Sequence, residues 1–125
     1  MQRGSAPPRK LIASVAQLAG ADSRTASEIE LAVGEALNNA HIHAYERGVG
    51  PVQIDVVVDG PQFTMVIHDH GAPVAPPAIP KESPGEGSGG GRGLYLIGQL
   101  MDDATVERLP HENRGTAVRM MKKLF

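Results

Sequence analysis

The chain has 125 residues, no cysteine and a formal net charge of -2 at pH 7, with 41% hydrophobic and 21% charged residues. This balance is typical of one globular domain and excludes a disordered chain, a disulfide framework, a strongly basic nucleic-acid-binding protein and, for want of a long apolar run, a membrane-spanning protein. We therefore expect a single domain over residues 1–125, located in the cytoplasm, without direct contacts to nucleic acid or membrane.

The first predicted element is a helix that begins at Pro7 and Pro8, because proline suits a first helical turn. Apolar residues recur at helical spacing until Gly20 ends the pattern, namely Leu11, Ile12, Val15, Leu18 and Ala19. A second, longer helix is predicted from near Ser23 to about Ala44, with Asp22 or Ser23 as its N-cap. Its apolar stripe consists of Ile29, Val33, Ala36, Leu37, Ala40 and Ala44.

A row of polar side chains borders this stripe on the second helix. Glu35, Asn39 and His43 follow one another at intervals of four residues and therefore share one edge of the helix. A carboxylate and an amide oxygen one turn apart can divide chemical work, since one accepts a proton and the other binds a hard cation such as Mg2+. A solvated polar edge is the alternative, although the doublet Asn38-Asn39 disfavours it because asparagine is poor in helix interiors.

Two strands are predicted next, over residues 52–59 and 63–69, with a turn at Gly60 and Pro61. The second strand runs into "HDHGAP", where Asp69 is followed two residues later by Gly71. Such an aspartate can direct its carboxylate into a cleft that the glycine keeps open, and an adenine amino group would suit it. An ordinary turn is the alternative. The nearby histidines do not have the spacing of a zinc site.

A long stretch rich in proline and glycine follows Asp69 and ends in "GEGSGGGRGLYLIG". A third helix is predicted to begin near Gly91 or Gly93. The spacing G-x-G-x-x-G is present, but no strand precedes it directly, so a dinucleotide fingerprint is not indicated. Free N–H groups at the start of this helix would bind an anion, and Arg92 would add a charged contact. A flexible linker is the alternative for the glycines.

Two further strands, over residues 104–110 and 116–125, are predicted to close the chain around a polar turn. The order of elements indicates an α+β fold, a two-layer sandwich in which three helices cover one face of a largely antiparallel mixed sheet.

Taken in order, three motifs make the pattern specific: E-x-x-x-N on a helix, D-x-G-x-P after a strand, and G-x-G-L-x-x-I at the start of a later helix. Together they resemble the GHKL-type ATP-binding fold of histidine kinases, gyrase-like ATPases and anti-sigma factor serine kinases. The stretches "GEALNNAHIHAY" and "GRGLYLIGQLMDDATVE" most resemble the anti-sigma factor serine/threonine kinases of bacteria. The resemblance covers nearly the whole chain.

The resemblance implies a role for each matching residue. Glu35 would be the general base that activates a protein serine, and Asn39 would ligate Mg2+ at the ATP phosphates. Asp69 would accept a hydrogen bond from the adenine amino group, with Thr116 nearby. The loop of about residues 70–92 would be the ATP lid. The other positions implied to bind ATP are His43, Gly71, Gly91, Arg92, Gly93 and Leu94.

The resemblance also implies partners. Such a protein holds a sigma factor away from RNA polymerase, or binds and phosphorylates an anti-sigma antagonist of the STAS type, and is usually a homodimer. The family has a strand before its first helix, whereas only "MQRGSAP" precedes it here. Either that strand is absent or the chain is cut from a longer protein, and the homodimer stays open.

Two alternatives remain. One is a non-catalytic ATP-binding anti-sigma or adaptor module, against which the presence of Glu35 argues. The other is the ATP-binding domain of a histidine-kinase-like protein, which would need a histidine-bearing pair of dimerisation helices.

Overall fold

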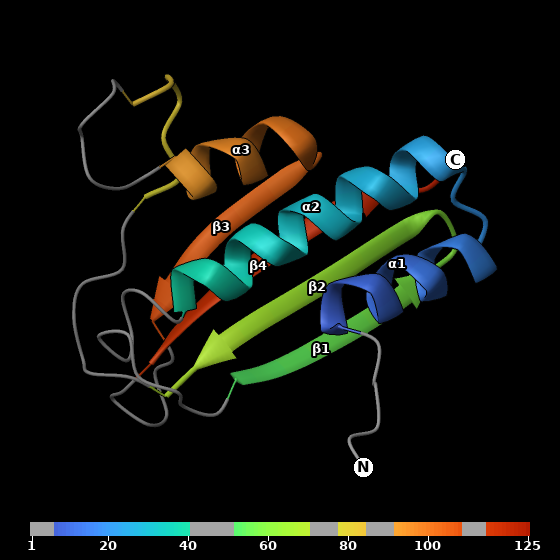
Figure 1. Cartoon of the computed structure of the whole chain (residues 1–125), viewed down its shortest axis with the longest axis horizontal. Coiled ribbons are helices and arrows are strands. Elements are labelled where there is room, and N and C mark those ends of the chain that lie inside the picture. Colours follow the sequence, from blue (N-terminus) through green and yellow to red (C-terminus); the bar gives the residue numbers. More distant parts are fainter. Residues whose placement is uncertain (1–6, 41–51, 71–77, 85–91, 109–114) are drawn as a thin grey trace, which may run out of the picture.

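The computed structural model describes residues 7–40, 52–70, 78–84, 92–108 and 115–125. These residues form three helices and four strands in the order α1, α2, β1, β2, α3, β3, β4. Figure 1 shows the helices together on one face of the sheet, which confirms the predicted α+β sandwich of two layers.

The first two helices begin where their start signals predict, and the first also ends as predicted. Helix α1 spans Pro8–Leu18 with proline in its first turn, and the chain leaves it through Gly20, whose φ of 119° suits glycine. Helix α2 spans Ser23–Asn39. Its N-cap is Asp22, whose carboxylate accepts a hydrogen bond of 2.8 Å from the Thr25 N–H. The predicted end of this helix near Ala44 lies outside the described residues.

The sheet has the strand order β1-β2-β4-β3, and every pairing in it is antiparallel. Strands β1 (Val52–Asp59) and β2 (Gln62–Asp69) form the predicted hairpin, with Gly60 at a φ of 59° in the turn. Strands β3 (Asp103–Arg108) and β4 (Thr116–Lys123) close the sheet, and β4 lies between β2 and β3. This order puts the end of β2 beside the start of β4.

Helix α3 spans Arg92–Leu100 and packs against α2. Its C-terminal end is tied to β4, because the Lys122 ammonium donates a 2.8 Å hydrogen bond to the Leu100 carbonyl and lies 3.4 Å from Glu28 Oε1 of α2. A lysine at this position satisfies a carbonyl that has no partner within the helix. These contacts hold the C-terminal end of α3 in place.

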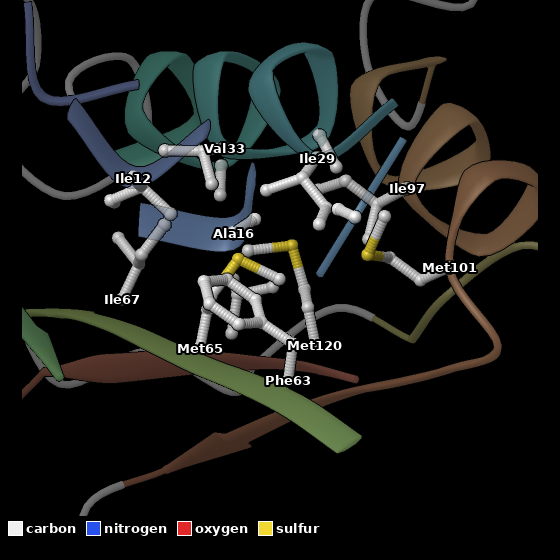
Figure 2. Close-up of a cluster of buried hydrophobic side chains, with 14 of the residues drawn as sticks. Ile12, Ala16, Ile29, Val33, Phe63, Met65, Ile67, Ile97, Met101 and Met120 are labelled. Atoms are coloured by element: carbon white, nitrogen blue, oxygen red, sulfur yellow. The ribbon is translucent and has the colours of Figure 1, made fainter. Parts of the chain in front are cut away.

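The core lies between the helices and the sheet and receives side chains from both layers. Figure 2 shows Ile12 and Ala16 of α1, Ile29 and Val33 of α2, and Ile97 of α3 above Phe63, Met65 and Met120 of the sheet. Strand β2 alternates strictly, with Phe63, Met65, Ile67 and Asp69 buried. Aliphatic and methionine side chains fill most of this space, as the low aromatic content predicts.

One part of the expected core is wrong. Leu11 and Leu18 of α1 are 59% and 89% exposed, whereas Ala13 and Ala16 are buried. The small side chains let α1 pack closely against α2, and Leu11 and Leu18 lie on the solvent side of α1.

Within the described ranges, no helix is long and apolar enough to cross a membrane.

Candidate functional site

Helix α2 carries the first two candidate residues on adjacent turns near its C-terminal end. The side chains of Glu35 and Asn39 are partly exposed, and each precedes a buried alanine in the chain, Ala36 and Ala40. They therefore lie at the rim of the buried face, where a carboxylate and an amide can meet a ligand while the helix stays anchored by its core side.

The start of α3 lies directly against Glu35. A methyl group built on Gly93 would be only 2.8 Å from Glu35 Oε1. The first N–H groups of a helix have no partner within it and carry the positive end of its dipole. The structure thus brings a carboxylate from one helix to the N-terminal end of another, although the two residues are far apart in the sequence.

Asp69 and Thr116 form the second group of candidate residues. Asp69 ends β2 with only 6% of its surface exposed, and its Oδ1 accepts a 3.3 Å hydrogen bond from the Thr116 N–H at the start of β4. A carboxylate has two oxygens and several lone pairs, so Asp69 can accept more than one hydrogen bond. A buried acceptor held in place by the sheet can select a ligand that carries an amino group.

Gly115 makes this arrangement possible, and sequence reasoning did not assign it a role. Its φ is 92°, and a methyl group there would overlap the Asp69 carbonyl oxygen. Only glycine lets the backbone before β4 approach Asp69 so closely. The signal was a glycine directly before the predicted last strand.

Both groups lie at the same end of the molecule. Figure 1 shows the C-terminal end of α2, the start of α3, the end of β2 and the start of β4 on its left side. His43, Gly71 and Gly91 lie outside the described residues. Arg92 is exposed at the start of α3, while the Leu94 side chain is buried in the core, so that only the Leu94 backbone is available to a ligand.

A hollow of about 410 Å3 opens beside Glu35, between the first turn of α1 and the exposed side of α2. The Arg9 guanidinium lies in its wall, 3.8 Å from Glu30 Oε2. The full lining consists of Arg9, Ser27, Glu30, Leu31, Gly34, Glu35 and Asn38. Glu35 therefore borders α3 and also an open concavity.

His68 and His70 contact each other, and His68 also lies near Asp55. The rings of His68 and His70 meet edge to face, 5.5 Å between centroids, and His68 Nε2 lies 3.7 Å from Asp55 Oδ2. Among the residues with described positions, no three His, Cys, Asp or Glu side chains converge to hold a metal ion. A divalent ion at Asn39 would therefore need oxygen ligands from a bound phosphate compound, as is common for Mg2+.

Comparisons with known proteins identify the family of the chain. Residues 5–122 match the family described as the histidine kinase-like ATPase domain. The anti-sigma F factor of Clostridium kluyveri is 29% identical over 103 residues, which cover 79% of this chain and 70% of the relative. The anti-sigma F factor of Bacillus subtilis is 31% identical over 105 residues, which cover 78% and 69%.

A solved structure supports the fold. The histidine kinase domain of a blue-light activated histidine kinase from Erythrobacter litoralis is similar over 97% of this chain and 70% of that one, with a TM-score of 0.57 and 24% identity.

The chain therefore belongs to the family of histidine kinase-like ATPase domains. Within it, the chain is a member of the group that contains the anti-sigma F factors, to which it is about 30% identical over most of its length. The family resemblance inferred from the three motifs is confirmed.

Proposed function

We propose that this protein is an ATP-dependent serine kinase that acts as a cytoplasmic anti-sigma factor. The observation that carries the proposal is the approach of Glu35 to Gly93, which joins a candidate base to a candidate phosphate-binding helix end. The similarity to anti-sigma F factors supports the same assignment.

The adenine would bind at the sheet end of the site. Asp69 accepts from the adenine amino group with a carboxylate that the Thr116 N–H already orients. Because this carboxylate is buried, an unmatched base such as guanine would leave it facing a carbonyl oxygen, which is unfavourable. The site therefore prefers adenine nucleotides.

The phosphates would bind at the helix end of the site. The backbone N–H groups of Gly93 and Leu94, with the Arg92 guanidinium, donate to phosphate oxygens. Asn39 would supply an amide oxygen to Mg2+, and the bound ion would neutralise phosphate charge. The donor set fits this pairing, because Asn39 follows Glu35 by one turn on α2 and the start of α3 adjoins Glu35.

Glu35 would act on the acceptor protein. Its carboxylate takes the proton from a serine hydroxyl that enters through the hollow between α1 and α2. Positioning accounts for most of the rate of phosphoryl transfer, so a rigid base on α2 suits this reaction. Glu35 can reach both substrates because it borders the hollow and α3 alike.

The proposed partners are a sigma factor and an antagonist of the STAS type, with the protein acting as one domain and as a homodimer. The test is incubation of the protein with ATP, Mg2+ and STAS-type antagonist proteins from the same organism, followed by mass spectrometry. A phosphoserine on the antagonist is expected. ATP binding without any phosphoserine would overturn the kinase assignment and leave a non-catalytic ATP-binding anti-sigma module.

A further inference from the structure

Helix α3 contains a glycine, Gly98, at a position where helix formation alone would favour another residue. Gly98 lies within Arg92–Leu100, although glycine is among the least favourable residues in a helix interior. A methyl group built on Gly98 would lie 2.8 Å from Cγ2 of Ile79. This distance is well below the usual contact distance between two carbon atoms, so the Ile79 side chain already fills the space beside Gly98.

Ile79 comes from the connection between β2 and α3, in the described segment 78–84. Its side chain is partly buried and packs against the hydrophobic core, whereas its neighbour Ala78 and the following Lys81 are exposed. The branched aliphatic side chain of Ile79 thus packs the described segment 78–84 against α3. The contact is specific, because the β-branched methyl is the atom closest to the missing side chain of Gly98.

We propose that Ile79 is a positioning residue for the nucleotide, acting through Gly98 of α3. The inference rests on the proposed function. Arg92 and Gly93, which would bind the phosphates, stand at the start of α3. A side chain packed against Gly98 of the same helix helps to hold α3, and with it these two residues, in place.

A first experiment measures the anchor without any nucleotide. Trypsin cleavage after the exposed Lys81 reports how often this segment leaves α3, because local opening precedes proteolysis. We expect Ile79→Ala and Gly98→Ala to speed this cut by about tenfold, and Ile79→Val, which keeps the branched methyl, to leave it near the wild-type rate. Unchanged cleavage in Ile79→Ala and Gly98→Ala would overturn the anchor.

A second experiment measures ATP affinity by calorimetry in the same variants. We expect Ile79→Ala and Gly98→Ala each to weaken binding about three- to tenfold, and Ile79→Val to restore it. In the double variant the two effects should not add, because Gly98→Ala meets no methyl once Ile79 is shortened. Melting temperatures of all variants serve as the control for stability.

The outcomes separate the two proposals. If the wild-type protein binds no ATP, the proposed function is overturned and the role of Ile79 in binding falls with it, while the trypsin result still decides the anchor. If the wild type binds ATP and the variants bind equally well, or if the two substitutions act additively, the positioning role of Ile79 alone is overturned.

Discussion

Gly93 and Glu35 occupy adjoining space, since a methyl group on Gly93 would lie 2.8 Å from Glu35 Oε1. The glycine at the start of α3 therefore does two things. It leaves the backbone N–H groups open to a ligand, and it leaves room for the carboxylate of another helix. Any side chain here would move Glu35, which links the glycine motif to the candidate base in a way that neither motif shows alone.

Substituting Gly93 by alanine tests this link. The carboxylate is the end of a flexible side chain, so Gly93→Ala should fold and shift Glu35 rather than disrupt the helix. We expect phosphoryl transfer to fall about 10- to 100-fold, because small displacements of a catalytic group are costly. Gln99→Ala, on an exposed position of α3, is the matched control. Equal turnover of Gly93→Ala and the wild type would contradict the link.

Asp69→Asn should separate nucleotide binding from folding. The asparagine side chain still offers an oxygen to the Thr116 N–H, so the sheet should retain its stability. It loses the charge that strengthens a hydrogen bond from an adenine amino group, and ATP affinity should fall about 10- to 100-fold. Calorimetry with ATP, together with urea denaturation, measures both. A variant that binds ATP as well as the wild type would show that Asp69 does not contact the base.

Gly115→Ala should destabilise the protein for two reasons, the strained backbone conformation and a steric overlap. The substitution adds a methyl group that overlaps the Asp69 carbonyl oxygen, at a φ of 92°. Backbone strain of this kind costs about 1–3 kcal/mol. We expect urea denaturation to show a larger loss in the free energy of unfolding, because the overlap adds to the strain. Gly60→Ala is the control, because Gly60 has a φ of 59° with no atom close to the added methyl. Equal losses would mean that contact with Asp69 contributes nothing.

The N-cap of α2 should make the stability of the protein depend on pH. The Thr25 backbone N–H, and after it the Thr25 side chain, hold the pKa of Asp22 below its ordinary value of 3.8. The carboxylate form is thus favoured in the folded state, and this stabilisation is present above the ordinary pKa and is lost as pH falls through the lowered one.

Asp22→Asn is the matched variant, since asparagine caps a helix without titrating. The melting temperature of the wild type should fall more than that of Asp22→Asn between pH 5 and the acid side of about pH 3. Asp22→Ala should be less stable than both at pH 7. Parallel pH curves for the wild type and Asp22→Asn would rule out this contribution.

Local patterns were sufficient to predict the elements. The proline start of α1, the Asp22 cap, the alternation in β2 and the turn at Gly60 each depend on neighbours in the sequence, and the structure has all of them. Strand pairing beyond the hairpin needed the overall order of elements, and the exposure of Leu18 depends on how closely α1 packs, which no local pattern carries.

The site depended on contacts between distant residues. Glu35 with Gly93, and Asp69 with Gly115 and Thr116, meet only in the folded chain. The motifs identified these residues, except Gly115, through the family resemblance. Ile79 lies in a proline- and glycine-rich stretch without a periodic pattern, so its neighbours in the sequence do not mark it. The signal that could have found it was Gly98, a glycine within a helical pattern, which often marks a close contact.

The most direct test of the kinase assignment is the effect of Glu35→Gln on ATP binding and phosphoryl transfer, measured with labelled ATP, Mg2+ and the antagonist. Glutamine keeps the shape of the side chain and removes its basicity. We predict ATP affinity close to that of the wild type and a loss of transfer of about 100-fold or more. Glu107→Gln, on an exposed position of β3, should transfer at the wild-type rate. Transfer by Glu35→Gln within a few-fold of the wild type would contradict the central claim that Glu35 is the base.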